Sequence, residues 1–182
     1  MTLLVATGFH RLTTTAELEA KLGKEIAGSE KIVVHDAFDP ESNVQIGVLP
    51  SGAPLVIDRT AVDTDLLIAE GFIEPHFFAG FSGGRKSILP GISSRETIFH
   101  NHAFSLDAAA LRSNPAVGNG ILQGNPLHED MCEAAGLVKN LFMVNLVMNT
   151  QMRLAAIFSG HYLTSWEQAC RTVNRIYQVD VP

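Results

Sequence analysis

Residues 74–86 read EPHFFAGFSGGRK, and this segment guides the interpretation of the whole chain. It combines a histidine, three glycines and a lysine, and it has neither the alternation of a strand nor the period of a helix. Glycine is favoured where a backbone turns tightly or comes close to a ligand. We therefore interpret the segment as a ligand-binding loop. Ser82-Gly83-Gly84 can present backbone N–H groups to an anion, and Arg85 adds a fixed positive charge.

Lys86 is the candidate nucleophile of this loop. A lysine is more often a solvated surface residue. Here the neighbouring Arg85 argues for a different role, because a close cation lowers the pKa of an amine. A lowered pKa leaves more of the lysine as the free, nucleophilic amine.

Gly80 to Ser87 nearly matches the P-loop of nucleotide hydrolases. That motif needs a glycine directly before the lysine, and Arg85 occupies this position. It also needs a helix that begins at the lysine, which Pro90-Gly91 would break. A phosphate-binding hydrolase is therefore the less favoured interpretation.

Four histidines are candidates for chemistry. A neutral imidazole takes up protons near neutral pH, so His10 and His76 are candidate acid/base residues. His100 and His102 would point about 200° apart on a helix, so only one of them can face a common site. The other histidines are expected to be structural or at the surface: His35, His128 and His161. His35-Asp36 is a lesser candidate for supporting the site.

Composition restricts the class of protein. With 182 residues, 46% hydrophobic and 18% charged, the chain is expected to form one globular domain over residues 1–182. Its net charge of −6 argues against nonspecific nucleic-acid binding. No apolar run is long enough for a membrane span, and no signal peptide is recognised. Cys132 and Cys170 form no metal or redox motif, which favours free thiols in the cytoplasm.

The pattern of elements predicts an α/β fold with a mixed, mostly parallel sheet, flanking helices and two hairpins. Strands are expected at residues 3–6, 31–35, 44–48, 54–57, 65–69, 141–148 and 153–158. Helices are expected at residues 15–26, from a capping box at Ser93 and Glu96 through His102, at 126–137 and at 163–176. His10 and His76 both follow strands, and ligand sites in open α/β sheets lie beyond the carboxyl ends of strands. The two residues are therefore expected to converge.

Several sequence blocks also occur in the order and spacing of a known family. They are Ala6-Thr7-Gly8-Phe9-His10-Arg11, Val34-His35-Asp36, residues 71–91, Glu96-Thr97-Ile98 with Asn101-His102, Gly124-Asn125-Pro126 and Met143-Val144-Asn145-Leu146-Val147. On these blocks the chain resembles the nickel-pincer lactate racemase family of 2-hydroxy acid racemases and epimerases. The match runs from Thr2 to about Val181, which implies the central part of the N-terminal catalytic domain.

The resemblance implies a role for each site residue. Lys86 would bond covalently to the nickel-pincer nucleotide, a pyridinium thioamide/thiocarboxylate mononucleotide whose two sulfurs and one ring carbon hold nickel. His102 would be the fourth nickel ligand. His10 and His76 would act as acid and base on the hydroxyl of a 2-hydroxy acid such as lactate, while the α-hydrogen moves as hydride to the cofactor. Ser82, Gly83, Gly84 and Arg85 are expected to complete the cofactor site.

The chain also departs from the family pattern. The family has an Asp-x-Thr-Arg-Pro-type motif upstream of His10, whose arginine holds the substrate carboxylate, and only Met1 to Phe9 precede His10 here. A second α/β domain would follow the position of Pro182. The chain is thus expected to be a domain truncated at both ends, inactive as an isolated chain. The rival interpretation is a non-catalytic cofactor-binding fragment.

Overall fold

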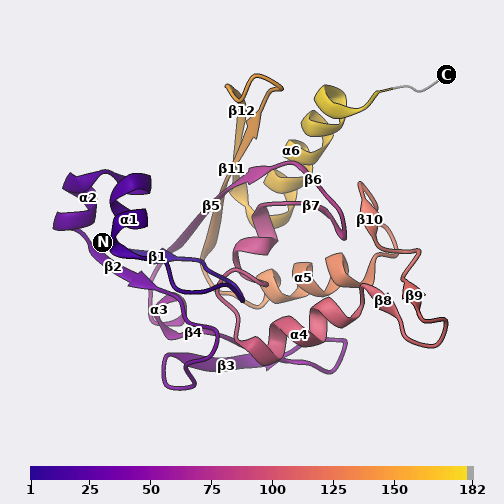
Figure 1. The fold of residues 1–182 in the computed structure, drawn as a ribbon, viewed down its shortest axis with the longest axis horizontal. Coiled ribbons are helices and arrows are strands. Elements are labelled where there is room, and N and C mark those ends of the chain that lie inside the picture. The colour runs from indigo at the N-terminus through magenta and orange to yellow at the C-terminus, as the bar shows by residue number, and fades with distance from the viewer. Residues whose placement is uncertain (180–182) are drawn as a thin grey trace.

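The computed structural model describes residues 1–179 and has helices packed on several small sheets (Figure 1). Its helices are α1 Thr15–Leu22, α2 Lys24–Ser29, α3 Arg59–Val62, α4 Arg95–Ala103, α5 Pro126–Gly136 and α6 Tyr162–Tyr177, with a 3₁₀ turn, η1, at Gly84–Ser87. Its strands are β1 Thr2–Val5, β2 Lys31–Val34, β3 Asn43–Val48, β4 Pro54–Asp58, β5 Leu67–Ile73, β6 Pro75–His76, β7 Ala79–Phe81, β8 Leu106–Asp107, β9 Arg112–Ser113, β10 Gly118–Asn119, β11 Leu141–Met148 and β12 Leu154–His161. The expected α/β class is confirmed.

The strands divide among separate sheets instead of forming the one sheet expected. The sheet with the longest strands has the order β12-β11-β5, in which β5 and β11 are parallel and β11 and β12 are antiparallel. β1 pairs with β2 in parallel, and β7 lies between β6 and β10. Both expected hairpins are present as β3–β4 and β11–β12. β3–β4 and β1–β2 are separate two-stranded sheets, so neither pair extends the β12-β11-β5 sheet.

β5 differs from its expected extent. It does not end before Gly71 but runs on to Ile73. It is also not buried on both faces, because Ile68 is 60% exposed. The extension matters because it carries the chain directly into the segment that contains His76.

The helix boundaries follow their caps. The capping box of Thr14 and Glu17 is present, but α1 ends at Leu22 because Gly23 takes a φ of +82°, and α2 follows as a separate helix. The box expected at Ser93 is wrong by one residue. Ser94 caps α4 by accepting from the Thr97 N–H, whereas the buried Ser93 hydroxyl donates to the Ile88 carbonyl. α4 carries His100 and His102 as expected.

Two apolar clusters hold these elements together. The first packs α4 and α5 against β4 and β11, with Ile57, Ile98, Leu127 and Met143 all at most 2% exposed. The second lies beneath α6 and is centred on Trp166, which is 1% exposed. Figure 1 shows α6 lying along β11 and β12. The segment before α4 contributes to both clusters, with Ile88 and Ile92 in the first and Phe81 in the second.

His35 joins the loop after β2 to that segment. Its Nδ1 lies 3.1 Å from Oδ2 of Asp58, and its Nε2 lies 3.0 Å from the carbonyl oxygen of Ser93. Both partners accept hydrogen bonds, so the ring satisfies both only with an N–H on each nitrogen. Burial alone would raise the pKa of Asp58, but hydrogen bonds from His35 and Thr60 outweigh it and lower that pKa. His35 is therefore structural, as the sequence indicates.

This pair predicts an acid-sensitive fold. Because the folded pKa of Asp58 lies below its ordinary value, its stabilisation is present above about pH 4, the ordinary pKa of aspartate, and is lost as the pH falls through the folded pKa. Asp58→Asn should cost about 1.5–3 kcal/mol at pH 7, typical of hydrogen bonds to charged groups. Urea unfolding between pH 3 and 7 measures both effects. Asp63→Asn, on the exposed end of α3, is the control and should change neither.

Candidate functional site

The segment after β5 forms a small hairpin followed by a 3₁₀ turn. β6 pairs with β7 through Pro75 with Phe81 and His76 with Gly80, and the turn between them carries Phe77 and Phe78. η1 then places Lys86 one residue before its end. No α-helix begins at Lys86, so the geometry differs from the P-loop considered above.

The two glycines before Arg85 let this segment pack closely against β5 and α6. At Gly83, φ is +62° and a Cβ would lie 2.6 Å from the carbonyl oxygen of Phe72. At Gly84, φ is +54° and a Cβ would lie 2.3 Å from Cδ1 of Trp166. Trp166 also donates from Nε1 to the carbonyl of Ser82 at 3.0 Å. The glycines thus serve close packing against the protein itself.

The expected anion-binding role of Ser82-Gly83-Gly84 is corrected in part. The Ser82 N–H donates to the carbonyl of Glu74 at 2.9 Å, and the Ser82 hydroxyl donates to the carbonyl of Phe72. Gly84 is buried against Trp166. Both donors of Ser82 therefore already bond to backbone carbonyls of the protein itself.

Packing at Gly84 predicts a specific loss of stability. Gly84→Ala should be more destabilising than Gly120→Ala, by about 1–3 kcal/mol of overpacking. Gly120 is a matched control, because its φ is +70° and a Cβ there would meet nothing within 4 Å. Both variants share the cost of a positive φ, so the difference in their urea midpoints isolates the contact with Trp166. Equal costs would mean that the Trp166 ring moves aside.

Arg85 lies inside the protein, with 1% exposure. Its guanidinium donates to the carbonyls of Ala79 and Phe81 and to Nδ1 of His128, and it lies 3.8 Å above the Trp166 ring centroid. The fixed positive charge that Arg85 was expected to add to the loop therefore faces the interior. The Arg85 charge can act on the candidate site only electrostatically, without direct contact.

His76, Lys86 and His102 come together around Phe78. The Phe78 ring centroid lies 4.6 Å from that of His76 and 5.2 Å from that of His102. Nζ of Lys86 lies 5.5 Å from the same centroid. Three of the predicted site residues, from β6, η1 and α4, thus share one partly buried aromatic partner. We call these four residues the Phe78 cluster.

Lys86 has the properties of an activated amine. Burial and then the charge of Arg85 lower its pKa to about 8. Desolvation and a like charge both disfavour an ammonium ion, so more of the side chain is the free amine near neutral pH. The sequence-based expectation for Lys86 thus agrees in direction with its surroundings.

His76 is held as a neutral ring. Burial, followed by the charges of Lys86 and Arg85, lowers its pKa to about 4. Its Nδ1 accepts from the backbone N–H groups of Ala79 at 3.2 Å and Phe78 at 3.4 Å. Because Nδ1 is the acceptor, the ring proton lies on Nε2. His76 therefore offers a hydrogen-bond donor in this state.

His102 and His100 differ as their spacing predicts. His102 is half-buried, and burial and then the charge of Lys86 lower its pKa. Its Nδ1 is enclosed and has no hydrogen-bond partner within residues 1–179; the Ile98 carbonyl comes near enough to oppose the shift without meeting hydrogen-bond geometry. His100 is exposed and contacts Phe104. Of the two, His102 is the neutral imidazole at the cluster.

His10 does not contact the Phe78 cluster, but the loop that carries it packs on the same helix. Its side chain is exposed, and within residues 1–179 it makes no hydrogen bond or ring contact with the Phe78 cluster. The preceding Phe9, however, packs on Phe99 of α4 with centroids 4.7 Å apart. Phe99 lies three residues, about 4.5 Å of rise, before His102. The loop of His10 and the Phe78 cluster thus contact neighbouring turns of one helix.

Arg11, beside His10, is already paired. Its Nη2 lies 2.6 Å from Oε1 of Glu17, and Nη1 donates to Oε2 at 2.9 Å. Both side chains are exposed. A substrate carboxylate would have to compete with this bidentate partner.

Two residues that organise the site were not among the predicted site residues. Phe78 contacts every polar member of its cluster, and Trp166 holds the loop from α6, far along the chain. An aromatic residue shortly after His76 was a usable signal for the first. Trp166 gave no local signal, because its contact with Gly84 exists only in the folded chain.

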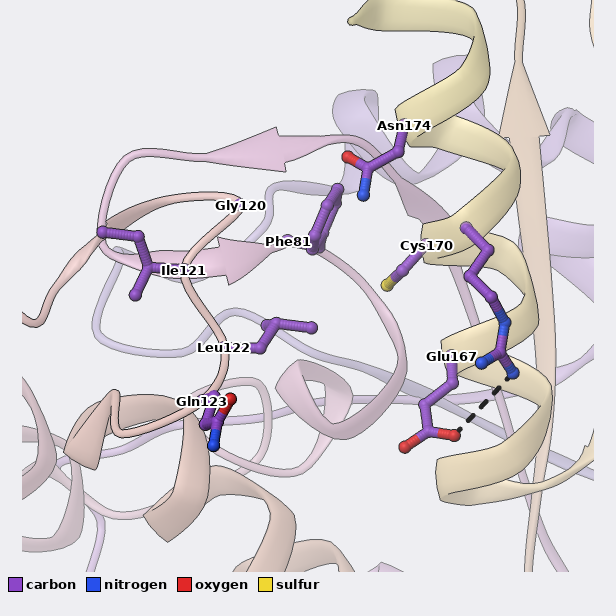
Figure 2. Close-up of a pocket in the computed structure, with 9 residues that line it drawn as sticks. Phe81, Gly120, Ile121, Leu122, Gln123, Glu167, Cys170 and Asn174 are labelled. Atoms are coloured by element: carbon purple, nitrogen blue, oxygen red, sulfur yellow. Dashed lines mark ion pairs between the residues drawn. The ribbon is translucent and has the colours of Figure 1, made fainter.

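A separate hollow lies between the loop at residues 120–123 and α6 (Figure 2). It is a groove of about 480 Å³ lined by Phe81, Leu122 and Cys170, with Glu167 and Arg171 pairing at 4.0 Å on its rim. No predicted site residue lines it. The Phe78 cluster is the better candidate, because it combines shifted pKa values with converging polar groups.

Two features are absent from residues 1–179. No three side chains of histidine, cysteine, aspartate or glutamate lie close enough together to hold a metal ion. A metal at His102 would therefore need ligands from another source. No helix in the same residues is both long and apolar enough to cross a membrane.

Comparisons with known proteins agree with one another. Residues 1–113 match the family model of the lactate racemase N-terminal domain. The chain is 46% identical to a lactate racemase of Thermoanaerobacterium thermosaccharolyticum over 178 residues, and 44% identical to one of Lactiplantibacillus plantarum over 177 residues. These alignments cover 98% and 97% of this chain but 41% of each relative.

Solved structures agree with these matches. The apoprotein of the T. thermosaccharolyticum enzyme superimposes with a TM-score of 0.89, over 96% of this chain and 41% of that one. A Thermotoga maritima protein of 25% identity superimposes with a TM-score of 0.77, over all of this chain and 48% of its own. The chain thus spans about two fifths of the curated relatives, and it belongs to the lactate racemase N-terminal domain family.

Proposed function

We propose that this chain is the cofactor-bearing part of a nickel-pincer racemase or epimerase of a 2-hydroxy acid such as lactate. The observation that carries the proposal is the convergence of Lys86, His76 and His102 on Phe78. Close relatives over the whole chain are lactate racemases, which supports the reaction class. The cytoplasmic location expected from the free cysteines stays a prediction.

The residues present fit the proposed nucleotide. Lys86 supplies an amine with a pKa of about 8, suited to a covalent bond with an electrophile. His102 supplies a neutral imidazole whose Nδ1 is enclosed, so Nε2 is left for nickel, and nickel accepts imidazole nitrogen. When bound, the nucleotide supplies a centre that takes up and returns the α-hydrogen of the substrate. The shortage of protein metal ligands is compatible with a cofactor that brings its own.

The proton of the substrate hydroxyl is assigned to His76 and His10. In the tautomer described, Nε2–H of His76 donates to a substrate oxygen. Accepting a proton at Nε2 requires the ring to release the two backbone N–H groups bound at Nδ1. His10, exposed and without such partners among the described residues, is free to act as the base in one direction.

The decisive experiment uses two proteins made together with the cofactor-synthesis enzymes. One is the 182-residue chain, and the other is the T. thermosaccharolyticum racemase in which this chain replaces the matching region; we call it the composite racemase. Both should carry the adduct and nickel by intact mass and metal analysis. Only the composite racemase should interconvert L- and D-lactate. Absence of adduct and nickel from both proteins would refute the proposal.

The alternative, a cofactor-binding fragment without turnover, is favoured for the isolated chain by its share of 41% of the relatives' length. Arg11 is paired and Arg85 is buried, so neither offers a free cation to a carboxylate. If the composite racemase is loaded but inactive, this alternative holds. Turnover by the isolated chain would contradict it.

The nickel ligand predicts a contrast within α4. In the loaded composite racemase, His102→Ala should lose most of its nickel, whereas His100→Ala should keep it, because only His102 faces the Phe78 cluster. Metal analysis after dialysis measures the difference. The two variants are matched in residue type and helix, so equal losses would mean that the wrong histidine was chosen.

A further inference from the structure

One face of the β12-β11-β5 sheet is apolar and exposed. We call it the open face and define it by Ile68, Phe72, Phe142, Val144, Leu146 and Ile157. The four most exposed members are Ile68 at 60%, Phe72 at 56%, Ile157 at 55% and Phe142 at 40%. Apolar patches of this kind on a soluble protein mark interaction surfaces.

The strand register makes these side chains one continuous surface. Leu146 pairs with Phe72 on one side and with Ile157 on the other. Phe142 pairs with Ile68, and Val144 lies between these two rows. Directly paired residues in a sheet point to the same face, so all six contribute to a single apolar layer.

The opposite face of the same sheet is fully covered. Met143 of β11 is 1% exposed within the first apolar cluster, and Val147 is 0% exposed within the second, beneath α6 and Trp166. β11 is therefore apolar on both faces, although only one is buried. β5 and β11 are a parallel pair, and parallel strands in α/β proteins are typically covered by helices on both faces. The sheet thus has one of the two covering layers that its strand pattern predicts.

We propose that the open face is covered by a helical layer of the same racemase fold, formed by polypeptide outside these 182 residues. The chain spans 41% of each curated relative, so the relatives contain ample further chain to supply such a layer. A second copy is a poorer occupant, since the face also carries Glu70, whose charge would be buried against an identical surface. The inference rests on family membership and not on the proposed catalytic roles.

The covering layer would also bear on the site. β5 runs from the open face directly into Glu74 and His76, with no intervening loop. Gly83 of the glycine segment packs on the carbonyl of Phe72. A layer over Phe72 would therefore hold the strand on which the Phe78 cluster is built.

Thiol labelling tests the proposal without requiring activity. Ile157→Cys and, as control, Leu111→Cys are each placed in the isolated chain and in the composite racemase, on a Cys132→Ser background. Cys170 is 3% exposed and should label slowly. Leu111 is 92% exposed and lies outside the open face.

The expected result is a contrast between the two proteins. In the isolated chain, the thiol introduced at position 157 should label as fast as the control thiol. In the composite racemase this thiol should label at least about tenfold more slowly, because labelling there requires local opening of the covering layer. The control thiol should label at the same rate in both proteins.

Two results would overturn the proposal. Equal labelling of position 157 in both proteins would mean that nothing covers the face. A dimer of the isolated chain by light scattering, dispersed by Ile157→Lys, would assign the face to a second copy. If Ile157→Cys prevents the composite racemase from folding, Ser159→Cys reports on the same face, because Ser159 pairs with Val144 and is exposed.

Discussion

Lys86→Ala should abolish covalent loading with the cofactor. The Lys86 amine is unusual in this chain in being largely buried, close to Arg85 and lowered in pKa to about 8. It also shares the Phe78 ring with both histidines of the Phe78 cluster. When the protein is made with the cofactor-synthesis enzymes, wild type should show an adduct on the peptide that contains Lys86. The variant should show the mass of the bare chain.

Two controls separate chemistry from folding. Lys86→Arg keeps a positive charge but removes the nucleophile, because a guanidinium stays protonated at all accessible pH values. It should also lack the adduct. Lys139→Ala removes an exposed lysine and should load normally. An adduct that persists in Lys86→Ala would place the attachment at another residue and would undo the assignment.

His76→Ala and His10→Ala should each lower kcat of the composite racemase by about 10²–10⁴-fold, the range of general acid–base catalysis. The adduct and the nickel should remain, because neither histidine is assigned to hold the cofactor. Chiral chromatography of lactate measures the rate in each direction, and intact mass measures the loading. His100→Ala, on the exposed side of α4, is the matched control and should retain activity.

The two variants need not be equivalent. Nδ1 of His76 already accepts two backbone N–H groups, which keeps the proton on Nε2, whereas His10 is exposed and unconstrained within the described residues. His10→Ala is thus expected to impair proton removal more in one direction than in the other. Near-full activity of either variant in both directions would rule out the two-histidine scheme.

Local sequence was sufficient for most elements. Capping residues and β-branched runs predicted α1, α5, α6 and both hairpins within a few residues, because these signals act between neighbours in the chain. The helical period indicated that only one of His100 and His102 could face a common site, and the family resemblance selected His102. Errors occurred where a longer-range contact decided the outcome. The Ser93 hydroxyl donates to the Ile88 carbonyl and so does not cap α4. β5 continues through Gly71 because it pairs with β11.

The family resemblance and the candidate site residues could be inferred from the order of residues in the chain, whereas the packing role of Gly83 and Gly84 could not. What each of these side chains faces depends on the folded structure. Arg85 was expected to add a positive charge to the loop, but its guanidinium is buried against Trp166, eighty-one positions later in the chain. Phe78 became the centre of the site because β6, η1 and α4 meet there. Burial and shifted pKa values arise from such meetings of distant segments, and no local pattern of residues records them.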